Sequence, residues 1–147
     1  MNLRNYTSSV TVERSVQLIE HCLVQAGADH ISKFYDTDKT LVGMTFQLQI
    51  TPGRFAAFKL PARWANVYKQ MMKGVKRPRP NTESLVKAQA QRTAWKLLYD
   101  QVSVLVSNVL IDQLSAVEAF MPYLFDGEKT LYENARDRQF KGLLGPG

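Results

Sequence analysis

The stretch from Val42 to Ile50 alternates between apolar residues and polar or small ones, and this period of two constrains the fold more than any other feature of the chain. Successive side chains of a β-strand point to opposite faces of a sheet, so the apolar members belong to one buried face: Val42, Met44, Phe46, Leu48 and Ile50. Pro52-Gly53 follows at once. A proline with fixed φ before a glycine that tolerates positive φ predicts a tight turn into a second strand at Arg54–Leu60.

Another strand and a helix are predicted upstream of this stretch. His30–Tyr35 reads as a hairpin partner, joined across a turn at Asp36–Lys39. From about Val10 to Ala26, apolar residues recur at steps of three and four, which is the spacing of an amphipathic helix, and Gly27 is its expected C-terminal cap. These segments predict an N-terminal helix followed by a three-stranded antiparallel meander.

Helices dominate the rest of the chain. Ala62–Met72 is predicted to form a short helix, and an exposed basic loop with two prolines follows at about 73–81. Beyond it, with Asn81 or Thr82 as the cap, no Gly or Pro occurs until Pro122, which predicts one long helix from about Glu83 to Ala119 that packs on the sheet. The fold class is therefore predicted as α+β.

Size and composition fit a single domain over residues 1–147. The chain is 45% hydrophobic and 22% charged, as in ordinary globular proteins. The tail is expected to pack back as a short hairpin or helix near Tyr123–Tyr132 and to fray at about 142–147. A lone Cys22, no apolar run of membrane-spanning length and no signal-peptide pattern together predict a cytoplasmic protein.

Charge is sorted along the sequence. Residues 39–99 contain twelve basic residues and one acid, Glu83, whereas the segments on both sides are net acidic. An ordinary solvated surface mixes both signs. Clustered Lys and Arg create a positive potential that attracts phosphate backbones, so the middle of the chain is a candidate nucleic-acid-binding surface.

The candidate binding residues are ten cations with two interleaved aromatic residues, which suit phosphate contacts and base stacking: Lys59, Arg63, Lys69, Lys73, Lys76, Arg77, Arg79, Lys87, Arg92, Lys96, Trp64 and Tyr68. Two alternatives remain open at this point. Trp64 and Tyr68, four residues apart, can instead anchor the core, and the loop can be a plain connection. Trp95 lies on the apolar arc of the long helix and is expected in the core.

The sequence contains no complete motif for catalysis or metal binding. Asp36-Thr37-Asp38 resembles the opening of a calcium loop, but Leu41 occupies the place where an EF-hand needs glycine. His21 and Cys22 are adjacent on a predicted helix and cannot easily chelate one ion, and no Gly-rich phosphate loop occurs. We therefore expect no enzymatic activity, no cofactor and no metal.

Several short motifs together resemble a small, functionally uncharacterised family of bacteriophage and mobile-element proteins: Tyr35-Asp36, Met44–Leu48, Thr51-Pro52-x-Arg54, Phe58–Pro61, Arg92–Lys96, Phe120–Leu124 and Thr130–Glu133. The resemblance covers nearly the whole chain and implies a phage or prophage origin, without catalytic residues. The chain departs from the family pattern between Asp100 and Asp112, where Val102, Ser103 and Ser107 replace a tryptophan and an acidic cluster.

These features favour a non-enzymatic nucleic-acid-binding protein that contacts the phosphate backbone of DNA or RNA with low sequence specificity. The alternative is a phage effector that binds and inhibits a host protein, such as a defence component or a polymerase. A nucleotide sponge is less favoured. Residues Val102–Val117 are apolar on more than one helix face, which predicts a homo-oligomer.

Overall fold

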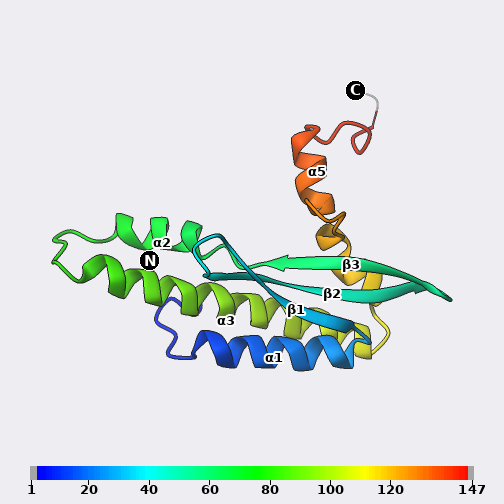
Figure 1. The fold of residues 1–147 in the computed structure, drawn as a ribbon, viewed down its shortest axis with the longest axis horizontal. Helices are drawn as coiled ribbons and strands as arrows, with labels where there is room; N and C mark the ends of the chain where they lie inside the picture. Colours follow the sequence, from blue (N-terminus) through cyan, green and yellow to red (C-terminus); the bar gives the residue numbers. More distant parts are fainter. Residues whose placement is uncertain (1–2, 146–147) are drawn as a thin grey trace.

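A computed structural model describes residues 3–145, which form an α+β fold around one three-stranded antiparallel sheet (Figure 1). The strands follow one another in the sheet as β1 (Asp29–Tyr35), β2 (Leu41–Thr51) and β3 (Arg54–Pro61). The longer helices are α1 (Val12–Gln25), α2 (Trp64–Lys73) and α3 (Thr82–Leu110), and the short ones are α4 (Ala116–Phe120), the 3₁₀ helix η1 (Met121–Tyr123) and α5 (Leu131–Asp137). The predicted fold class and order of elements are confirmed. Within the described residues, no helix is both long and apolar enough to cross a membrane.

The core lies between one face of the sheet and the pair α1 and α3, which run side by side beneath it (Figure 1). Met44, Phe46 and Leu48 are buried, as the alternation predicts, and Val42 is half-buried. The prediction is wrong for Ile50, which is 46% exposed near the end of β2. The Phe46 ring stacks on Phe58 at 5.4 Å between centroids and meets Phe120 edge-on at 5.3 Å. Aromatic pairs in these geometries stabilise a core beyond the area that they bury.

Local signals set the ends of α1 and of the hairpins. Gly27 has a φ of 91°, and the N–H of Ala28 donates to the carbonyl of Leu23, which completes a glycine cap. In the β1–β2 turn, Asp36 Oδ1 accepts the N–H groups of residues 38 and 40, both at 2.9 Å. Gly53 adopts a φ of 77° in the β2–β3 turn, as expected after Pro52.

The long helix ends sooner than predicted. The expectation of one helix up to Ala119 is wrong, because α3 stops at Leu110 and α4 begins after a turn. Asp112 has a φ of 62°, and the N–H groups of residues 113 and 114 both donate to the carbonyl of Asn108. Ser115 then caps α4 by accepting the N–H of Glu118 at 3.0 Å. Asp tolerates the left-handed backbone conformation and Ser caps the start of a helix, so a helix can stop and another begin without Gly or Pro.

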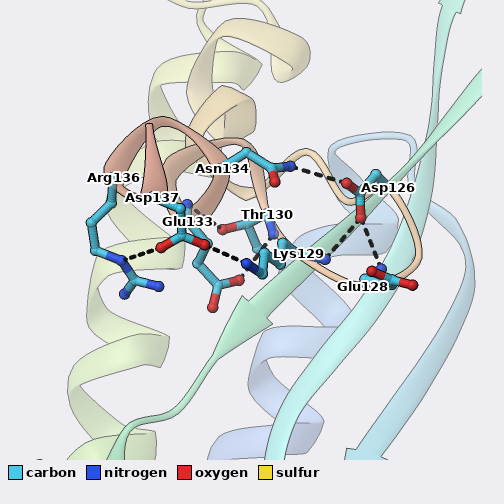
Figure 2. Close-up of polar contacts among 8 residues, drawn as sticks. All are labelled: Asp126, Glu128, Lys129, Thr130, Glu133, Asn134, Arg136 and Asp137. Carbon is cyan, nitrogen blue, oxygen red and sulfur yellow. Dashed lines mark hydrogen bonds and ion pairs between the residues drawn. The ribbon is translucent and has the colours of Figure 1, made fainter. Parts of the chain in front are cut away.

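The C-terminal segment returns to the free edge of β3. The N–H of Phe125 donates to the carbonyl of Ala57 at 2.9 Å, and Leu124 pairs with Phe58 in an antiparallel bridge. Figure 2 shows the start of α5, where Thr130 and Glu133 form a reciprocal capping box. Of the predicted frayed tail at 142–147, residues 142–145 form an exposed turn and end, and residues 146–147 lie outside the described residues.

Candidate nucleic-acid interface

The positive charge of the chain gathers on α2, the loop at 74–81 and the first half of α3, which we call the basic hairpin (residues 63–96). The two helices pack against each other in opposite directions (Figure 1). The basic hairpin contains nine basic residues and one acidic residue, whereas the rest of the chain contains ten and twelve. Its single acid, Glu83, lies in the first turn of α3, where the helix dipole favours a negative charge.

Seven cations of the basic hairpin are exposed, and none forms an ion pair with any part of residues 3–145: Arg63, Lys69, Lys73, Lys76, Arg77, Arg79 and Lys87. On α2, Lys69 and Lys73 lie one turn apart on the side away from the buried Met71. Exposed like charges on one surface repel one another, and an anionic partner would relieve that repulsion.

The loop at 74–81 bridges the open end of the basic hairpin. Its two arginines and Lys76 are exposed, and few backbone contacts hold it. The N–H of Arg79 donates to the Thr82 hydroxyl at 2.7 Å, so the Thr82 side chain holds the end of the loop. Asn81 occupies the N-cap position of α3, one of the two positions predicted, but its side chain makes no capping hydrogen bond.

Two of the predicted phosphate contacts already have partners within the chain. The Nζ of Lys96 lies 2.7 Å from Oδ1 of Asp100, and 20% of the Lys96 side chain is exposed. Arg92 is half-buried and donates to Gln89 Oε1 at 2.6 Å. Since a phosphate would have to compete with these partners, Lys96 and Arg92 are weaker candidates than the seven exposed cations.

Asp100 anchors the N-terminal segment to α3. Its Oδ2 accepts hydrogen bonds from Arg4 at 2.8 Å and Asn5 at 2.7 Å, and Thr93 donates to the carbonyl of Asn5. Burial of the Asp100 carboxylate favours its neutral form, but the hydrogen bonds from Lys96, Arg4 and Asn5 outweigh burial and lower the pKa to about 2. No sequence pattern indicates this contact, because Arg4 and Asn5 are more than ninety positions from Asp100 in the chain.

Lys59 lies away from the loop, on the face of the sheet opposite α1 and α3. Its register partner Thr45 alternates with the buried Met44 and Phe46 and so points to that opposite face. The Lys59 ammonium lies 3.6 Å from the centroid of the Phe34 ring and 5.3 Å from that of Phe125. These cation–π contacts fix the position of its charge.

Trp64 and Tyr68 are half-buried on α2 and do not belong to the core, whereas Trp95 is fully buried as predicted. The Trp64 and Tyr68 rings meet edge-on at 6.4 Å. Lys87 of α3 places its ammonium 5.3 Å from the centroid of the Trp64 ring. Trp64 is thus an aromatic side chain within the positive surface of the basic hairpin.

An open cavity of about 410 Å³ lies where β3 meets α2; we call it the α2 cavity. It brings together three of the predicted residues, Lys59, Arg63 and Trp64, beside Pro61 and Asp36. A second cavity, of about 380 Å³ between α1 and the β1–β2 turn, combines Lys33 and Lys39 with Glu13. That cavity mixes both signs of charge and does not extend the basic surface.

No protein-family model matches this chain, and comparisons with curated proteins and with solved structures found no significant match. The resemblance to a phage family therefore stays a prediction. Within residues 3–145, no three His, Cys, Asp or Glu side chains are grouped so that they could hold a metal ion.

Proposed function

We propose that this protein binds nucleic acid without catalysis and contacts the phosphate backbone through the basic hairpin. One observation carries the proposal: the basic hairpin concentrates nine basic residues against one acid, and seven of its cations are exposed without an ion pair in residues 3–145. Lys and Arg that neutralise phosphates release bound counterions, which supplies affinity without regard to sequence. The expected setting is that of a phage or mobile element, as the sequence resemblance implies.

The test is a titration of labelled oligonucleotides followed by fluorescence anisotropy at several salt concentrations. If about six phosphates are neutralised, affinity should fall on the order of a thousandfold between 50 and 200 mM salt. Oligonucleotides of unrelated sequence should bind alike, because contacts to phosphates carry no base information. Binding that ignores salt, or no binding to DNA or RNA at low salt, would remove this function.

Self-association and the alternative function, inhibition of a host protein, both concern three exposed apolar side chains, Leu97 and Val104 of α3 and Ile111 at its C-terminal cap, which we call the α3 stripe. Val104 is 63% and Ile111 is 71% exposed. Their spacing of seven residues is that of a seam between paired helices. We propose a second copy of this chain as the occupant of the stripe, since identical helices can pair through such a seam. A host protein that co-purifies in fixed stoichiometry and is displaced by a charge at Val104 would favour the effector function instead.

A further inference from the structure

We propose that the α2 cavity receives one unstacked base of a single-stranded nucleic acid. This inference deepens the proposed function and rests on it, because the basic hairpin must first hold the strand. It adds a substrate class: single strands are preferred over duplexes of the same charge.

The volume and lining of the α2 cavity suit a nucleobase with an attached phosphate. Its volume of about 410 Å³ lies in the range of small-molecule sites. Val42, Pro61 and Ala62 give it an apolar part, and Trp64 adds an aromatic ring. Nucleobases stack on aromatic side chains in a sequence-tolerant way, because every base has a π-face.

Cations at the same cavity can hold the phosphate that accompanies the base. Arg63 is exposed and makes no ion pair within residues 3–145. Its guanidinium can contact two phosphate oxygens at once. The Lys59 ammonium also lines the cavity and is held in place by its contact with Phe34. The phosphate would thus be bound where the basic hairpin meets the sheet.

Polar groups of the cavity can contact the edge of the base. Asp36 is held in place by two backbone N–H groups on its Oδ1, so its other oxygen can accept from a base amino group. The Asn66 side chain carries both a donor and an acceptor. With one carboxylate and one amide at the cavity, we expect a mild preference among bases rather than a defined sequence.

The preference for single strands follows from the accessibility of their bases. In a duplex each base is stacked and paired, so a base can enter a protein cavity only after it leaves the stack, which costs free energy. Bases of a single strand are already accessible. A protein that binds phosphates alone would instead favour the duplex, whose charge density is higher.

Tryptophan fluorescence tests the proposal on the full chain. The chain has two tryptophans, and Trp95 is fully buried in the core, so a ligand in the α2 cavity should change the emission of Trp64 alone. Oligothymidylate at low salt should quench part of the emission, and a duplex of equal phosphate number should quench far less. Trp64→Phe should remove the quenching while the Trp95 emission persists.

Binding measurements on two variants give a second test. Trp64→Ala should weaken binding of oligothymidylate roughly tenfold and leave duplex binding unchanged. A tenfold loss corresponds to the lower part of the range of binding free energy that one stacked base contributes. Tyr132→Ala removes an exposed aromatic residue of α5 and should change neither. Because Trp64 is half-buried, circular dichroism must first show that its variant is folded. If it is not, Arg63→Ser replaces it, compared with Arg138→Ser, which also removes an exposed arginine.

The outcomes separate this inference from the proposed function. Salt-sensitive binding that is equal for single strands and duplexes, with no response of Trp64, would overturn the base cavity and leave phosphate binding intact. Binding of free nucleotides as tight as that of the oligonucleotide would also overturn it, in favour of a nucleotide site. Absence of all nucleic-acid binding would remove both.

Discussion

The ammonium of Lys87 lies 5.3 Å from the centroid of the Trp64 ring, a contact that joins the exposed side of α3 to the start of α2. A cation–π contact at an exposed site stabilises by about 0.5–1 kcal/mol. Lys87→Met should therefore lower the free energy of unfolding by about that amount, measured by urea denaturation. Lys69→Met is the matched control, because it removes an exposed lysine of α2 that makes no cation–π contact within residues 3–145. Equal effects of the two changes would mean that the contact contributes nothing.

The loop at 74–81 should contribute to binding but not to stability. Replacing Lys76, Arg77 and Arg79 together by Ser should leave the melting temperature within a few degrees, since exposed surface changes cost below about 0.5 kcal/mol each. Binding of nucleic acid should weaken at least about tenfold, because several phosphate contacts are lost. Changing Arg14, Arg138 and Lys141 to Ser removes the same charge outside the basic hairpin and is the control. If both triple variants bind alike, only net charge matters.

Asp100 should make stability depend on pH in the acid range. Its pKa is about 2 in the folded chain, below the ordinary value of 3.8, so the unfolded state binds the proton more readily. The stabilisation, on the order of 2 kcal/mol, is present above about pH 4 and is lost as the pH falls toward 2. The Asp100 side chain is 16% exposed and that of Lys96 is 20% exposed, so solvent screens this pair less than the Arg4 contact, whose Arg4 side chain is 75% exposed.

Asp100→Asn tests this dependence. The variant should be less stable than the parent by on the order of 1–2 kcal/mol at pH 7, and the difference should shrink as the pH falls from 4 to 2. Denaturation curves at each pH measure it. Asp126→Asn serves as a comparison, since that exposed carboxylate also has a pKa of about 2, from hydrogen bonds within its own turn. A constant difference across the range would show that Asp100 acts through packing rather than charge.

The α3 stripe should mediate self-association. Val104→Lys should shift the protein toward monomer at micromolar concentration, measured by sedimentation velocity, because a charge would be buried in the contact. Folding should be unaffected, since Val104 is exposed. Leu85→Lys makes the same change at an exposed apolar position of α3 outside the stripe and should leave association intact. A parent that is strictly monomeric would disprove this prediction.

Local periodicity determined much of the fold. The alternation around Phe46 depends only on the two-residue repeat of a strand, and Pro52-Gly53 sets its turn through backbone sterics that need no tertiary partner. The same holds for α1 and its cap at Gly27. The uneven distribution of charge is also evident from the sequence alone, and its basic segment includes the basic hairpin.

Tertiary structure decided which charged residues remain available. The sequence treats Lys96 and Arg77 alike, but α3 places Lys96 against Asp100 while the loop leaves Arg77 exposed. Only folding brings Asp36, in the turn between β1 and β2, to the same cavity as Trp64 of α2. The break at Asp112 escaped prediction because a left-handed backbone conformation and backbone hydrogen bonds to Asn108 end the helix there, without the Gly or Pro that marks such an end in a sequence. Local sterics are encoded within a few residues, whereas pairing and exposure depend on contacts that the chain makes only when it is packed.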